Sequence, residues 1–146
     1  MRTLLFLIAL FAMTPVHAGQ ALDTCCRLTA FNPGKTMELQ IAVTNLQDQS
    51  LLIHQTLAEW DLRLDIRDAN GRQVPLTDYG RHVATVERSG SLRKHTLARD
   101  QQFTQSIDLG KVYELTSGSY SITVFRDVFL GEKTVELKMT TTIRIP

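Results

Sequence analysis

Two neighbouring cysteines are the residues whose types and spacing suggest chemistry most directly. Cys25 and Cys26 are adjacent, and they are the only cysteines in this 146-residue sequence. Neighbouring thiols could close a strained vicinal disulfide, bond to a second molecule, or bind Cu(I) or Zn(II) together with a histidine. They could also remain buried structural thiols, whereas Asp23 and Thr24 match a lipid-attachment signal poorly. We expect disulfide chemistry at Cys25 and Cys26, because the chain carries a signal for export to an oxidising compartment.

The histidines and serines show none of the spacings that mark a catalytic or metal site. His54, His82 and His95 are scattered, without the H-x-H or H-E-x-x-H patterns of zinc sites. The sequence also lacks the G-x-S-x-G elbow that presents a nucleophilic serine. We therefore predict no catalytic residues, no dedicated metal site and no cofactor, and a protein that is not an enzyme.

A cluster of basic residues is the candidate binding site. Between residues 81 and 99, Glu87 is the one acidic residue, and the basic residues are Arg81, Arg88, Arg93, Lys94 and Arg99. We expect a hairpin here, formed by strands at 81–88 and 92–97 around a Ser-Gly-Ser tip. The candidate binding residues could dock on an anionic surface or an acidic protein patch. They are Arg81, Arg88, Arg93, Lys94 and His95. They could instead only keep an edge strand soluble.

The first 18 residues are typical of a secretory signal peptide. Arg2 precedes ten apolar residues, Leu4–Met13, and small side chains at Val16 and Ala18 favour cleavage after Ala18. A membrane-spanning helix needs about twenty apolar residues, so we expect no transmembrane span after cleavage. Export implies a secreted or periplasmic protein. Removal of Arg2 takes the 16 basic residues to 15, equal to the 15 acidic residues, which argues against a general nucleic-acid binder.

Alternation of apolar and polar residues with a period of two runs through most of the remaining chain. It predicts strands near residues 37–44, 60–67, 103–107, 119–126 and 135–145. Trp60 is in phase with Leu62 and Leu64, so we expect a core position for its indole, while Asp61 and Arg63 share a solvated, salt-bridged face. The pattern predicts an all-β antiparallel sandwich of seven to eight strands over residues 36–146, preceded by an irregular segment at 19–35.

Late in the sequence, Gly118, Tyr120 and Ile122 stand in the spacing G-x-Y-x-I. This segment resembles the tyrosine corner of immunoglobulin-like domains, in which the motif is G-x-Y-x-C. The resemblance implies an immunoglobulin-like sandwich in which the Tyr120 hydroxyl ties back to the backbone upstream. Thr116 stands where that family places an aspartate, and Ile122 where it places a cysteine.

A second resemblance covers more of the chain. Asn45 at a strand end, the run Trp60-Asp61-Leu62, the turn Asp68–Gly71 and the tyrosine motif follow one another as in BsuPI-type proteinase-inhibitor domains of bacteria. The turn contains Asn70-Gly71, a strong hairpin signal in its own right. This resemblance implies an inhibitor that presents an extended loop, with Asp78–Arg81 and Glu87–Lys94 as the candidate loops.

These observations favour a secreted or periplasmic, non-catalytic binding module whose loops recognise another secreted or envelope protein. One alternative is a protease inhibitor. Another is a structural subunit of a pilus or envelope, which would need an open groove for strand exchange. An anionic surface is a second kind of partner, and nucleic acid is not expected.

Overall fold

The computed structural model describes residues 19–22, 25–32, 37–88 and 90–146. Over this part of the chain it is an all-β sandwich of two antiparallel sheets, which confirms the predicted fold class. The described residues form nine strands where the sequence predicts seven to eight. The predicted signal peptide lies outside the described residues.

The first sheet has the strand order β1-β2-β3-β7. Its strands are β1 (Gly19–Leu22), β2 (Cys26–Phe31), β3 (Glu38–Asn45) and β7 (Gln102–Asp108). Residues 19–35, for which the sequence predicts irregular structure, thus contribute two strands. β2 forms because Cys26, Leu28 and Ala30 alternate with more polar residues and bury one face of the strand.

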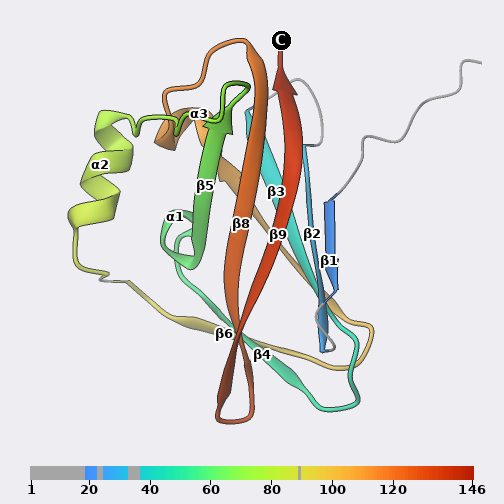
Figure 1. Ribbon diagram of the computed structural model, residues 1–146. Coiled ribbons are helices and arrows are strands. Elements are labelled where there is room, and N and C mark those ends of the chain that lie inside the picture. The colour runs from blue at the N-terminus through green and yellow to red at the C-terminus, as the bar shows by residue number, and fades with distance from the viewer. Residues whose placement is uncertain (1–18, 23–24, 33–36, 89) are drawn as a thin grey trace, which may run out of the picture.

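The second sheet is organised around one long antiparallel hairpin. β8 (Gly118–Leu130) and β9 (Lys133–Ile145) are 13 residues each and pair along their whole length. On its other side β8 has two partners in succession, first β5 (Leu62–Asp68) and then β4 (Leu51–Gln55). β6 (Arg93–Leu97) completes the sheet beside β4. Figure 1 shows β8 and β9 running the length of the sandwich.

Apolar side chains from both sheets fill the space between them. The largest fully buried ones include Leu28, Leu39, Ile41 and Val43 of the first sheet and Leu51, Ile53, Ile66, Ile122, Val124 and Val128 of the second. Most of them occupy alternate positions, as the period-two pattern predicts, so that one face of each of their strands lies in the core. Among the described helices, none is long and apolar enough to cross a bilayer.

In the described part of the chain, three short helices interrupt the strands: α1 (Ala58–Asp61), α2 (Asp78–Thr85) and α3 (Leu109–Val112). The predicted hairpin of 81–88 with 92–97 is wrong, because α2 occupies the first segment and β6 pairs with β4 instead. Thr77 begins α2 by accepting a hydrogen bond from the Gly80 amide over 3.0 Å. An eight-residue helix makes about two turns, too few for a helical period to stand out in the sequence.

Hydrogen bonds confirm two local predictions. Gly71 has a φ of 76°, and its amide donates to the Asp68 carbonyl over 2.9 Å, which forms the predicted turn. The Tyr120 hydroxyl accepts from the Thr116 amide over 3.1 Å and donates to the Thr116 carbonyl over 3.0 Å. This is the tie to upstream backbone that the tyrosine motif implies.

Candidate functional site

Trp60, the one tryptophan of the chain, lies in α1 between the end of β4 and the start of β5. The prediction that it continues a strand into the core is wrong, since β5 begins at Leu62 and the indole is half-buried. Its Nε1 donates a hydrogen bond to the Val83 carbonyl of α2 over 3.3 Å. The turn of α1 is needed here because β4 and β5 follow different segments of β8.

Three hollows meet at Trp60. The first, of about 290 Å³, lies between α2 and β5. The second, of about 300 Å³, lies between α1 and the segment that enters β6, and the third, of about 280 Å³, lies over the end of β8. We call this surface the Trp60 face; it comprises Leu57, Trp60, Arg63, Val83, Val86, Arg88, Leu92, Arg93 and Phe129.

The large apolar side chains that stay exposed among the described residues are all on the Trp60 face. Leu57, Val86 and Leu92 are 48, 37 and 49% exposed. Val86 lines the first hollow, Leu57 the second and Leu92 the third. Exposed apolar residues gathered around a half-buried tryptophan are typical of surfaces that bind other proteins.

Two members of the predicted binding cluster border these hollows. Arg88 lines the first and third hollows, and Arg93 lines the second. Lys94 follows Arg93 on β6, and all three side chains are exposed. None of the three forms an ion pair with another described residue, so their charges are available to a partner.

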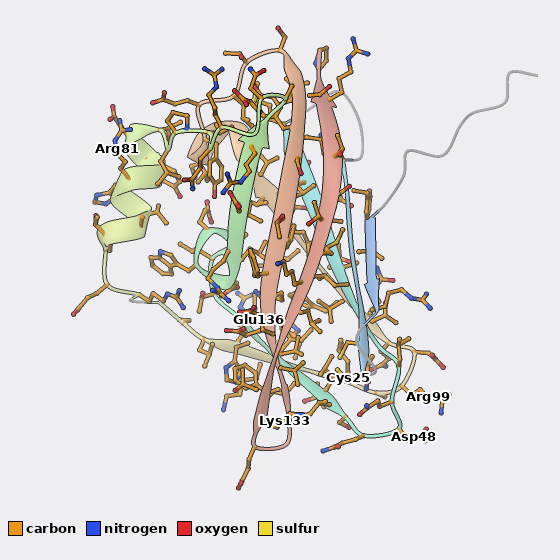
Figure 2. The ribbon with its side chains drawn as sticks, viewed as in Figure 1. Cys25, Asp48, Arg81, Arg99, Lys133 and Glu136 are labelled. Atoms are coloured by element: carbon orange, nitrogen blue, oxygen red, sulfur yellow. The ribbon has the colours of Figure 1, made fainter. Side chains whose placement is uncertain are left out.

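Arg81, which the sequence also assigns to the binding cluster, lies elsewhere. It is on α2, where its guanidinium pairs with Asp78 and with Glu114. Figure 2 shows Arg81 on the outer side of α2, away from the strands. Asp78–Arg81 is therefore helical, and it does not present the extended backbone that the BsuPI resemblance implies for an inhibitory loop.

His95, the last residue of the predicted cluster, makes contacts within the sandwich. Its ring packs on Phe103 of β7, with centroids 4.7 Å apart. Its Nε2 lies 2.6 Å from Gln55 Oε1 of the neighbouring β4. His95 therefore connects β6 to β7 of the first sheet and to β4 of its own sheet. It does not belong to the Trp60 face.

A buried ion pair lies beside the third hollow. Asp61 Oδ2 is 3.5 Å from Arg126 Nη1, and both side chains are at least nine-tenths buried. Asp61 also accepts hydrogen bonds from the Thr56 amide and hydroxyl and from Gln105 Nε2. Arg126 Nη2 donates to the His54 carbonyl over 2.6 Å. The pair joins β4, α1 and β8 at the point where β8 exchanges one partner strand for the other.

Burial and hydrogen bonding act in opposite directions on this pair. Burial alone would raise the pKa of Asp61, but hydrogen bonds from Thr56 and Gln105 and the charge of Arg126 outweigh it, so the pKa lies below its ordinary value. Burial lowers the pKa of Arg126, and Asp61 opposes this effect. The prediction of a solvated face is thus wrong for Asp61, whereas Arg63 is exposed and pairs with Glu136.

One wall of the first hollow is a helix that is held mainly at its N-terminal end. Gly80 of α2 packs so closely on α3 that a Cβ there would lie 2.2 Å from the Val112 carbonyl oxygen. The Thr77 amide donates to that same carbonyl, and the Thr77 hydroxyl donates to the Lys111 carbonyl. Towards the other end of α2, the contact with the body of the sandwich includes the long hydrogen bond from Trp60.

Cys25 and Cys26 lie away from the Trp60 face, at the start of β2. They are 4 and 0% exposed, and the Cys26 thiol donates a hydrogen bond to Cys25 Sγ over 2.9 Å. Figure 2 shows Cys25 at the end of the sandwich that carries Asp48 and Arg99. Within the described ranges, no three His, Cys, Asp or Glu side chains are grouped so that they could hold a metal ion.

In comparisons with known proteins, no family model and no curated protein matches this chain. The Trp60 face is the candidate functional site of the described residues, because it combines hollows, exposed apolar side chains and two arginines, Arg88 and Arg93, without acidic partners.

Proposed function

We propose that this protein is a non-catalytic binding module that holds an acidic segment of another protein, bearing a bulky apolar side chain, on its Trp60 face. The observation that carries this function is the meeting of three hollows at one half-buried tryptophan, bordered by exposed Leu57, Val86 and Leu92. A partner that covers these side chains removes apolar surface from water, which favours association.

The charge of the face indicates the chemistry of the partner. Arg88 and Arg93 are exposed and lack acidic partners among the described residues. A segment with carboxylates beside a bulky apolar side chain would neutralise these charges and fill a hollow at the same time. Because the charges are exposed, we expect the affinity to fall as the salt concentration rises.

We also propose a secreted or periplasmic location and an immunoglobulin-like form of the sandwich. A signal peptide at residues 1–18 supports a secreted or periplasmic module whose partner comes from the same compartment. The hydrogen bonds between Tyr120 and Thr116 support an immunoglobulin-like sandwich.

The single tryptophan makes the binding function testable by fluorescence, since a ligand on this face changes the emission of Trp60. The probes are short synthetic peptides in which glutamates flank one phenylalanine, with glutamine-substituted peptides as a comparison. We expect a saturable change in emission for the acidic peptides that weakens with added salt. Equal binding of the glutamine peptides would contradict the proposed partner chemistry.

Paired variants place the binding on the structure. Leu57→Ser with Leu92→Ser removes the apolar rim, and Arg88→Gln with Arg93→Gln removes the charge. We expect each double variant to lose most of the peptide affinity. The matched control is Arg27→Gln with Arg144→Gln, which removes two exposed charges from β2 and β9. Full binding by a folded rim variant would exclude the Trp60 face as the site.

A further inference from the structure

A bend brings the two adjacent thiols of this chain together. In a regular strand, neighbouring side chains point to opposite faces, which keeps adjacent cysteines apart. Cys25 lies in a bend immediately before β2, and both Cys25 and Cys26 are buried in the core. Their sulfur atoms lie 2.9 Å apart in hydrogen-bond contact. The two thiols are thus positioned to react with each other.

The surroundings favour this reaction over the other outcomes that adjacent cysteines allow. With Cys25 4% and Cys26 0% exposed, neither sulfur is presented to the surface of a second folded protein, whereas a small oxidant needs to reach only Cys25. No histidine or carboxylate of the described residues joins the two sulfurs in a group that could hold a metal ion. The disulfide that remains possible is the one between Cys25 and Cys26.

We propose that Cys25 and Cys26 form a redox modification site that closes reversibly to a vicinal disulfide, independently of the Trp60 face. The oxidant is a small-molecule disulfide of the glutathione type. The thiolate of Cys25, the more exposed of the two, attacks one sulfur of the oxidant and releases one thiolate; the Cys26 thiolate then attacks Cys25 Sγ and releases the second. The two cysteines lose two electrons and two protons, which end on the two thiols of the reduced oxidant.

Covalent geometry makes this bond a reversible one. Consecutive Cα atoms are about 3.8 Å apart across a trans peptide, whereas the Cα atoms of disulfide-bonded cysteines are usually about 4.4–6.8 Å apart. A bond between adjacent residues is therefore strained, and strain makes a disulfide easier to reduce. We expect the bond to open again as the concentration of free thiol rises.

The backbone around the pair connects it to two turns of the sandwich. The Leu46 amide donates to the Cys25 carbonyl over 3.0 Å, and Cys26 lies opposite Asn45 in the pairing of β2 with β3. Asn45 is fully buried, and its side chain donates to the carbonyls of Gln49 and Leu97. Closing the ring changes the backbone at Cys25, so we expect the turn at 46–50 to loosen on oxidation.

Intact mass spectrometry after incubation with oxidised glutathione tests the proposal. We expect a monomer that is lighter by two hydrogen atoms, does not react with iodoacetamide when unfolded, and regains both thiols in dithiothreitol. Peptide mapping would then find the bond between Cys25 and Cys26. A covalent dimer, a stable glutathione adduct, or two thiols that remain open to alkylation would overturn the proposal.

Single substitutions and hydrogen exchange complete the test. Cys26→Ser leaves one thiol at Cys25, and we expect it to retain glutathione as a mixed disulfide instead of losing two hydrogen atoms. Cys25→Ser should react more slowly, because Cys26 is fully buried. Faster amide exchange at residues 46–50 in the oxidised wild-type protein supports the connection to Asn45, and unchanged exchange excludes it. If a variant does not fold, the wild-type mass measurement still decides between the outcomes.

Discussion

The Trp60 face and the junction at Asn45 are both places where strands meet turns, yet they are built differently. We call the latter the Asn45 end; it comprises Asn45 and the turns at 46–50 and 98–101. The buried Asn45 side chain makes three hydrogen bonds to the backbone, and Arg99 pairs with Asp48 across the two turns at 2.8 Å. The Trp60 face instead has hollows and exposed apolar side chains.

The buried polar atoms that lack a hydrogen bond show the same difference. Among the described residues these are Asp65 Oδ1, Gln105 Oε1 and Arg126 Nη1. Gln105 and Arg126 both surround Asp61 beside the third hollow, and none of the three atoms belongs to the Asn45 end. The buried side-chain polar groups described at the Asn45 end all have hydrogen-bond partners, whereas two such groups beside the third hollow do not.

The largest expected effect comes from breaking the ion pair beside the Trp60 face. Asp61→Ala leaves Arg126 buried without its carboxylate, and such a charge lowers the free energy of unfolding by about 3–5 kcal/mol. Urea denaturation followed by circular dichroism measures the loss. The matched control is Asp48→Ala, which removes an exposed ion pair at the Asn45 end and should change stability little. Equal losses in the two variants would contradict the comparison.

The next effect comes from opening the Asn45 end. Asn45→Ala removes the side-chain partner of backbone groups of Gln47, Gln49 and Leu97, of which the bond to Leu97 is buried, and we expect a loss of about 2–3 kcal/mol in the free energy of unfolding. Thermal and urea unfolding both report this loss. Asn70→Ala, at an exposed turn, serves as the control. A change as small as that of the control would show that the hydrogen bonds of Asn45 contribute little.

Low pH should lower the free energy of unfolding by protonating Asp61, beside the Trp60 face. The pKa of Asp61 in the folded protein lies below its unfolded value, so its stabilisation is fully present above about pH 4 and is lost as the pH falls through the folded pKa. The free energy of unfolding of the wild type minus that of Asp61→Asn should therefore shrink in acid. Urea titrations at a series of pH values measure this difference, and a constant difference would exclude the assigned pKa direction.

The smallest expected effect on stability comes from the rim of the Trp60 face. Leu92→Ser should change the free energy of unfolding by less than about 0.5 kcal/mol, because the side chain is 49% exposed. The same variant should weaken peptide binding in the fluorescence titration. A marked loss of stability would instead assign Leu92 to the packing of the sandwich.

The strands could be predicted from the sequence because one buried face imposes a period of two. The alternation at Leu39, Ile41 and Val43 is of this kind, and each of these side chains is buried. The role of Tyr120 could also be predicted from the sequence, because its hydroxyl bonds to Thr116, only four residues away. α2 could not be found in this way, because its start depends on a cap at Thr77 and on close packing against Val112.

The residues of the candidate site were harder to predict. Arg126 carried a signal, since it is in phase with the buried residues Ile122 and Val124 of β8, where a charged side chain requires a partner. Its partner Asp61 carried none, because the turn of α1 removes Asp61 from the strand pattern. Gln105 binds Asp61 from 44 residues away, a contact that no local pattern contains.

The length of β8 also determines the order in which the second sheet can be assembled. β8 and β9 join through a tight turn at Gly131, so this hairpin closes with little loss of chain entropy. β5 pairs with β8, which follows it in the chain only after α2, β6, β7 and α3. β5 therefore cannot pair with β8 until β8, which is synthesised later, is present. Trp60, in α1 immediately before β5, belongs to a surface that we expect to form late.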